Sequence, residues 1–89
     1  MKIHLLKKLE IENEKTDFSV EIFTSYGEAC YRLEELVENY PQRGLCHPIL
    51  EEAESEDEWK CEGFGNNPNL KCHLKVEEYD MKGYSLIKN

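Results

Sequence analysis

The sequence has no apolar run long enough to cross a membrane. No stretch of about 18 apolar residues occurs in its 89 residues, and the amino-terminal M-K-I-H-L-L-K-K lacks the apolar segment, roughly 7–15 residues long, of a signal peptide. The N-x-[ST] glycosylation sequon is absent as well. These absences predict a cytoplasmic protein with no membrane partner, in which the four cysteines remain reduced thiols.

Recognisable catalytic and cofactor motifs are missing too. Gly63 and Gly65 do not continue into a G-x-G-x-x-G phosphate-binding loop, and the acids of residues 51–58 lack the spacing and the glycine of a calcium loop. No family signature surrounds any cysteine or histidine, so a Cys–His catalytic pair has no support beyond the presence of both residue types. The sequence therefore predicts that the protein is not an enzyme and that it holds no cofactor or metal.

The cysteines and histidines leave one alternative open, a metal- or redox-responsive module. Its residues would be Cys46, His47, Cys61 and Cys72. No C-x-x-C occurs and the gaps between these residues are long, which disfavours a zinc site. Cys72 also alternates with polar residues in phase with apolar ones, as a buried strand cysteine would. If residues 59–76 form a hairpin, Cys61 and Cys72 face each other as close thiols or as a disulfide.

Positive charge is scarce. The chain has 19 Asp and Glu residues against 11 Lys and Arg residues, giving a net charge of -8. Residues 51–62 alone contribute -6, from seven acids and one base. An acidic surface repels the phosphates of nucleic acids and anionic membranes, so we expect no direct binding to either. The acidic run can serve as a docking surface for a basic protein, or it can be a solvated loop that keeps a small protein soluble.

Residues 26–40 have the pattern of an amphipathic helix. Ser25 and Glu28 form an S-x-x-E capping box at its start, and Tyr40-Pro41 ends it. The apolar residues that share one helical face are Ala29, Leu33, Leu36, Val37 and Tyr40. We expect this helix to organise the fold without carrying chemistry, and we expect the flanking strands to cover its apolar stripe.

Alternating apolar and polar residues predict strands on both sides of the helix. The expected strands, in chain order, are residues 3–11, 18–22, 58–64, 70–76 and, as a short edge strand after a turn at 79–83, 84–87. The apolar faces of the first two strands are Ile3, Leu5, Leu9 and Ile11, and Phe18, Val20 and Ile22. Residues 48–56 have only a short apolar edge, so we expect a weak helix or a mobile acidic loop there.

These elements predict a two-layer α+β fold, in which one antiparallel sheet of four to five strands packs against one α-helix in the order ββαββ. No internal repeat and no long linker divides the chain, so we expect a single domain over residues 1–89. The exposed edge strands, which are the first strand or residues 84–87, could pair with a second copy of the chain.

The layout and two short phrases are similar to those of small uncharacterised α+β proteins of bacteria and phages. The first phrase is F-T-S-Y-G-E-A, at Phe23–Ala29, which ends a hairpin before the single helix. The second phrase is V-E-E-Y-D, at Val76–Asp80, in a late strand. The resemblance implies a ββαββ fold and implies no catalytic residues.

The sequence-based hypothesis for function is a non-enzymatic, acidic interaction protein of the kind that phages and mobile elements encode. It would bind a basic surface on a partner protein, such as a nucleic-acid enzyme, and act as an inhibitor or regulator. The residues expected to contact that partner are Glu51, Glu52, Glu54, Glu56, Asp57 and Glu58.

Overall fold

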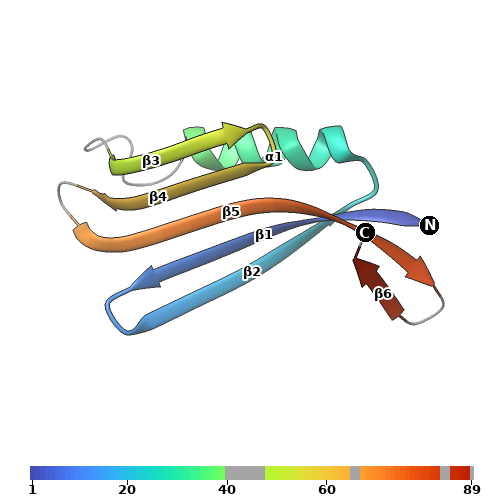
Figure 1. Cartoon of the computed structure of the whole chain (residues 1–89), viewed down its shortest axis with the longest axis horizontal. Helices are drawn as coiled ribbons and strands as arrows, with labels where there is room; N and C mark the ends of the chain where they lie inside the picture. The colour runs from blue at the N-terminus through green and yellow to red at the C-terminus, as the bar shows by residue number, and fades with distance from the viewer. Residues whose placement is uncertain (40–47, 65–66, 83–84, 89) are drawn as a thin grey trace.

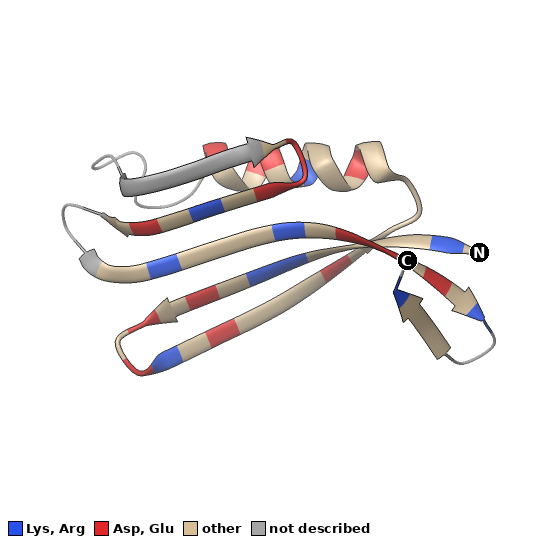
Figure 2. Ribbon diagram, in the orientation of Figure 1, with Lys and Arg blue, Asp and Glu red and all other residues tan. Residues whose placement is uncertain are grey.

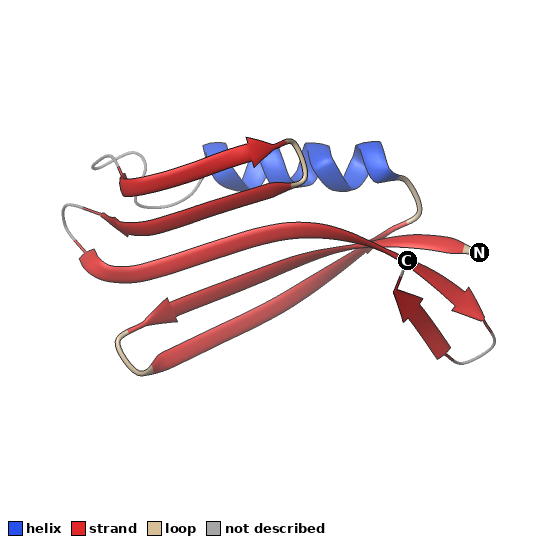
Figure 3. Cartoon of the chain, viewed as in Figure 1, coloured by secondary structure: helices blue, strands red, loops and turns tan. Residues whose placement is uncertain are grey.

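The computed structural model describes residues 1–39, 48–64, 67–82 and 85–88, with the backbone alone at 48–54, 64 and 67–68 (Figure 1). Along these described residues, one helix and six strands follow each other (Figure 3). Their bounds are β1 (Lys2–Glu12), β2 (Lys15–Phe23), α1 (Tyr26–Glu38), β3 (Pro48–Ser55), β4 (Glu58–Phe64), β5 (Asn67–Lys82) and β6 (Ser85–Lys88). The described strands form one sheet in the spatial order β2-β1-β5-β4-β3, and β6 pairs with β5.

The fold class predicted from the sequence is confirmed in its main features. All strand pairs are antiparallel, and the single described helix packs on the sheet, so the fold is a two-layer α+β arrangement. The sheet has six strands rather than four to five. The additional strand is β3, which is the next described element after the helix.

The prediction of a weak helix or a mobile loop at residues 48–56 is wrong, because most of this segment forms strand β3. The segment pairs with β4, with Leu50 opposite Glu62 and Glu52 opposite Lys60. An amphipathic helix needs apolar residues on several successive turns, whereas this segment has only a short apolar run at its start. Backbone pairing along an available edge of the sheet therefore decides the structure of the acidic run.

Helix α1 begins where the capping box predicts. The Ser25 hydroxyl oxygen accepts a hydrogen bond from the backbone N–H of Glu28 at 3.4 Å, so the capping serine satisfies one of the helix's first free donors. The helix ends at Glu38, two residues earlier than expected. There the side-chain amide of Asn39 donates to the carbonyl of Glu35 at 2.9 Å. The predicted stop at Tyr40-Pro41 lies outside the described residues.

The hydrophobic core lies between α1 and one face of the sheet. The helix contributes Ala29 and Leu33, both buried, while Leu36 and Val37 are partly buried against the same cluster. The sheet contributes, from β1, β4 and β5, the buried residues Leu6, Trp59, Cys61, Leu70, Cys72, Leu74 and Val76. The helical stripe predicted from the sequence is therefore the stripe that packs.

The faces of β1 and β2 that point toward the helix are not the predicted ones. Leu6 lies opposite Val76 in the β1–β5 register, and residues directly opposite each other share a face. Because Val76 belongs to the core, β1 turns His4 and Leu6 toward α1. The expected apolar faces, which are Ile3, Leu5, Leu9 and Ile11 of β1 and Phe18, Val20 and Ile22 of β2, lie on the other side of the sheet, called the open face below. On this face Ile3 and Leu5 are buried, whereas Phe18, Val20 and Ile22 are exposed.

The edges of the sheet agree with the prediction in part. β1 lies between β2 and β5, so the first strand is not an edge strand. Within the described residues the strands that pair on one side alone are β2, β3 and β6, so the short edge strand expected at residues 84–87 is confirmed as β6. β5 continues through residues 79–82, where a turn was expected, and pairs there with β6. No helix among the residues that the structure describes has both the length and the apolar composition that a membrane crossing needs.

Candidate functional site

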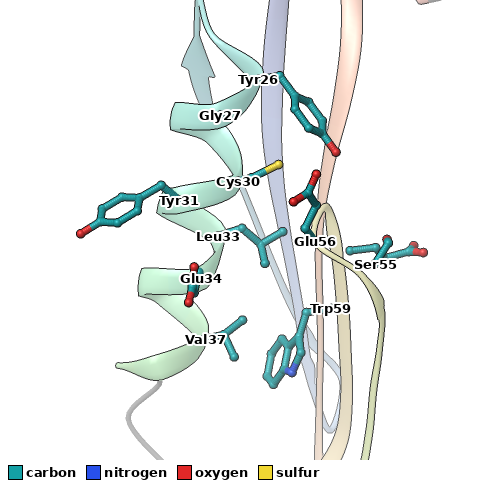
Figure 4. Close-up of a pocket in the computed structure, with 11 residues that line it drawn as sticks. Tyr26, Gly27, Cys30, Tyr31, Leu33, Glu34, Val37, Ser55, Glu56 and Trp59 are labelled. Carbon is teal, nitrogen blue, oxygen red and sulfur yellow. The ribbon is translucent and has the colours of Figure 1, made fainter.

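A groove of about 470 Å³ lies between α1 and the turn that joins β3 to β4 (Figure 4). It exists because the helix contacts β1, β5 and β2 most closely, which leaves a space beside the β4 end of the sheet. The volume is in the range of ligand pockets, about 300–1,000 Å³. The groove is lined by Tyr26, Gly27, Cys30, Tyr31, Leu33, Glu34, Val37, Ser55, Glu56, Glu58 and Trp59.

The wall of the groove is apolar. Trp59 of β4 has only 2% of its surface exposed, and its indole ring lies across from Leu33 and Val37 of the helix (Figure 4). Tyr26 and Tyr31 add aromatic surface and are 40% and 70% exposed, respectively. Large aromatic side chains in such positions bury much area when a partner covers them. The groove therefore offers a site for an apolar anchor.

Acidic side chains border this apolar surface. Glu34 reaches the groove from the helix and Glu56 from the β3–β4 turn, where its carboxylate points toward Tyr26 and Cys30 (Figure 4). Asp57 in the same turn accepts hydrogen bonds from the Tyr26 hydroxyl at 3.3 Å and from the Ser55 hydroxyl at 2.6 Å. None of the described residues that line the groove is a Lys or Arg. A ligand bound here meets negative charge.

Tyr26 and Cys30, one helical turn apart, show the effect of this charge. The hydrogen bond with Cys30 raises the pKa of Tyr26, and burial and the nearby carboxylates Asp57 and Glu56 raise it further. Burial also raises the pKa of the Cys30 thiol, despite the opposing hydrogen bond from Tyr26. Both groups are therefore protonated near neutral pH. A protonated thiol is a weak nucleophile, so this pair favours a binding surface over thiolate catalysis.

The structure separates the six acids predicted to contact a partner. Glu51, Glu52 and Glu54 belong to the part of β3, residues 48–54, where the backbone alone is described. Glu56 and Asp57 form the β3–β4 turn beside the groove. The carboxylate of Glu58 lies on the open face, 2.7 Å from His73 Nε2, and the hydrogen bond with His73 lowers the pKa of Glu58. Among the predicted partner-binding acids whose side chains are described, Glu56 and Asp57 lie next to each other beside the groove, and Glu58 points to the open face.

The residues of the metal- or redox-responsive alternative do not converge within the described structure. Cys61 and Cys72 lie directly opposite each other in the β4–β5 register, as the hairpin predicts, and both are buried in the core. Cys46 and His47 lie outside the described residues. Among the residues with described side chains, no group of three or more His, Cys, Asp and Glu is placed to hold a metal ion. A redox role for the two opposed cysteines stays a prediction.

Sequence reasoning missed the groove because its parts come from distant segments. Trp59 was expected as a strand residue and Leu33 as part of the helical stripe, but no local pattern indicates the space between them. The signal that could have pointed to it is the presence of two tyrosines, Tyr26 and Tyr31, near the start of the capped helix. No protein-family model, curated protein or solved structure matches this chain.

Proposed function

We propose that the protein is a non-enzymatic interaction protein of the cytoplasm that binds a basic segment of a partner protein in the groove between α1 and the β3–β4 turn. The partner segment combines an apolar side chain, which enters beside Trp59, with flanking Lys or Arg. The acidic, apolar groove is the observation that carries this proposal. A partner that normally binds nucleic acid fits this chemistry, since such proteins display basic surfaces, and the protein would then inhibit or regulate it.

The two parts of the groove have different roles in this binding. Burial of an aromatic or aliphatic anchor supplies most of the free energy, at roughly 25 cal/mol per Å² of apolar surface. Glu34 and Glu56 supply the preference for a basic segment and speed its approach. Because both carboxylates are exposed, each contributes only about 0.2–1 kcal/mol. The proposed function therefore needs both the apolar wall and the acidic border.

The direct test uses Trp59, which is the single tryptophan of the chain. Synthetic peptides without tryptophan, in which Lys and Arg flank Leu and Phe, are titrated into the protein while the indole emission is recorded. We expect a saturable change in emission with the basic peptides and none with peptides that carry Glu in place of Lys and Arg. The Kd should rise about five- to ten-fold in the variant E34Q/E56Q, which corresponds to roughly 1–1.4 kcal/mol.

The matched control is E14Q/D17N, which removes two exposed carboxylates at the β1–β2 end of the sheet. Its Kd should stay within two-fold of the wild-type value. Equal weakening of peptide binding by both double variants would mean that net charge alone governs the affinity. This result would contradict the proposed binding site in the groove. Capture of partners from a lysate, with wild type and E34Q/E56Q side by side, then identifies the protein that carries the basic segment.

A further inference from the structure

The outermost strand β2 carries an apolar stripe that no described residue covers. Phe18, Val20 and Ile22 project from the open face with 61%, 40% and 66% of their surfaces exposed. The helix packs on the opposite face, and β1 pairs with only one side of β2. Isolated apolar side chains on a surface are ordinary, but three in a row on a sheet edge are a feature of association sites.

The backbone of the same three residues points outward at this edge. β1 and β2 are joined by the two-residue turn Asn13–Glu14, with Asn13 at φ 55°, so the flanking pair Glu12 and Lys15 is a hydrogen-bonded one. Hydrogen bonding to the neighbouring strand alternates along an antiparallel strand. From Lys15 onward, the odd residues of β2 therefore bond to β1. The even residues, Phe18, Val20 and Ile22 among them, direct their N–H and C=O groups away from the sheet.

We propose that β2 pairs antiparallel with β2 of a second copy of this chain and forms a symmetric dimer with a continuous sheet. When the twofold axis passes through a residue of β2, each even-numbered residue of one copy lies opposite an even-numbered residue of the other. The outward backbone groups of each copy then bond to those of the other. The apolar stripes of both copies join on one face across the dyad. This interface is separate from the groove and does not depend on the proposed function.

Charge selects the register of this pairing. With the dyad at Phe18, Lys15 of each copy lies opposite Glu21 of the other, which places opposite charges together twice. With the dyad one residue further, at Ser19, Asp17 lies opposite Glu21 and like charges meet twice. Like charges directly opposite each other in a sheet are destabilising. Of these two registers the one centred on Phe18 is therefore favoured, and it places the two Phe18 side chains opposite each other.

The expected affinity is modest. An aromatic side chain such as Phe18 presents roughly 150–250 Å² when fully exposed, and Val20 and Ile22 are smaller, so the partly exposed stripe offers at most about 300 Å² of apolar surface per copy. Pairing at the edge covers only the flanks of these side chains, because they project from the face of the sheet, so two copies bury less than about 600 Å² of apolar side chain. This is below the roughly 1,200–2,000 Å² of a standard interface before the strand backbones are counted. We expect a Kd of about 10–100 µM. A second copy fits better than an acidic partner, because the edge itself is self-complementary.

The test is sedimentation equilibrium or light scattering over a concentration series at 150 mM NaCl. The wild-type chain of 10.5 kDa should show a reversible monomer–dimer equilibrium. The variant F18T/I22T keeps the net charge and a strand-forming residue at each position, and its Kd should rise at least ten-fold. The matched control L86T/I87T removes two apolar side chains of β6 that are 47% and 49% exposed, and its Kd should be unchanged.

A second variant separates edge pairing from stacking of the open faces. V20P removes an outward N–H while leaving the β1 side of the strand intact, so it should also abolish the dimer. Circular dichroism confirms that each variant is folded. A wild-type chain that stays monomeric up to 1 mM would overturn the proposal. So would a dimer that survives F18T/I22T, one that L86T/I87T abolishes, or one that V20P leaves intact.

Discussion

Glu77 is the most strongly paired carboxylate among the described residues. Its Oε2 atom lies 2.8 Å from Lys88 Nζ and 3.4 Å from Lys7 Nζ, and it accepts a hydrogen bond from the Tyr79 hydroxyl at 3.2 Å. The hydrogen bond from Lys88 is the main cause that lowers the pKa of Glu77 to about 2, against the opposing effect of burial. This network ties β6 to β1 and β5 on the open face.

The variant E77Q should therefore lose stability in a pH-dependent way. An unfolded glutamate has a pKa near 4.3, so the folded state gains stability above that pH and loses it as the pH falls from about 5 to 2. After allowance for solvent screening, we expect E77Q to be about 1–2 kcal/mol less stable than wild type at pH 7. Urea unfolding at pH 7 and pH 2 measures this difference.

At pH 2 the difference between E77Q and wild type should shrink to a few tenths of a kcal/mol, because about half of the Glu77 carboxylate is then protonated in the folded state and nearly all of it in the unfolded state. The control E14Q changes an exposed carboxylate in the β1–β2 turn and should show no difference at either pH. A deficit in E77Q that is the same at both pH values would mean that shape and packing, not charge, explain the effect.

His4 shows what residue patterns cannot reveal. It was expected among the polar residues of β1, yet it is 9% exposed, and its ring meets the edge of Tyr26 at a centroid distance of 5.7 Å. Its Nδ1 atom is buried without a hydrogen-bond partner in the described structure. A buried polar atom of this kind costs free energy, so its position is imposed by the rest of the fold. The strand register imposes it, through the pairing of β1 with β5.

At the scale of elements, the start of α1 can be tested through its cap. S25A removes the hydroxyl that accepts from the Glu28 N–H and should lower the free energy of unfolding by about 1 kcal/mol. The control S85A changes an exposed serine of β6 and should stay within about 0.5 kcal/mol of wild type. Chemical denaturation of both variants measures the loss. An S25A protein as stable as wild type would show that tertiary packing alone fixes the helix start.

Local patterns predicted most elements but not the way they assemble. The capping box predicted the helix, and period-two alternation predicted strands β1, β2, β4 and β5. The hairpin expected from β4 and β5 also predicted that Cys61 lies opposite Cys72. The missed strand, β3, has a composition that suits no regular element and is fixed by its partner β4. The side of β1 that faces the helix depends on the register in which β1 pairs with β5, and these two strands come from opposite ends of the chain. The groove follows from that assembly and so escaped prediction too.

At the scale of the molecule, charge differs between the two layers. The outer part of α1 carries Glu28, Glu34, Glu35 and Glu38 against Arg32, which bonds to Glu21 and Glu35 (Figure 2). The open face carries Lys7, Lys60, Lys71, Lys75 and Lys88 against Glu58, Glu62 and Glu77. The acidic excess therefore lies on the helix side, where the groove is. The open face has a small excess of positive charge.

The two proposed interactions should consequently respond to salt in opposite directions. Two copies with a net charge of -8 repel each other by about 9 kcal/mol at roughly 30 Å in water without salt. The screening length falls from about 30 Å at 0.01 M to about 8 Å at 0.15 M, so added salt relieves most of this repulsion and should strengthen the dimer. The same screening weakens the attraction of Glu34 and Glu56 for a basic peptide.

Between 20 and 300 mM NaCl, we expect the Kd of the dimer to fall at least ten-fold and the Kd of the basic peptide to rise about three- to ten-fold. Sedimentation equilibrium measures the first value and Trp59 emission the second, in the same buffers. In E34Q/E56Q the salt dependence of peptide binding should flatten while that of the dimer persists, because the net charge falls only to -6. If added salt changed the dimer and peptide affinities in the same direction, one surface would serve both interactions. The proposal that the groove binds peptide and the β2 edge forms the dimer would then be wrong.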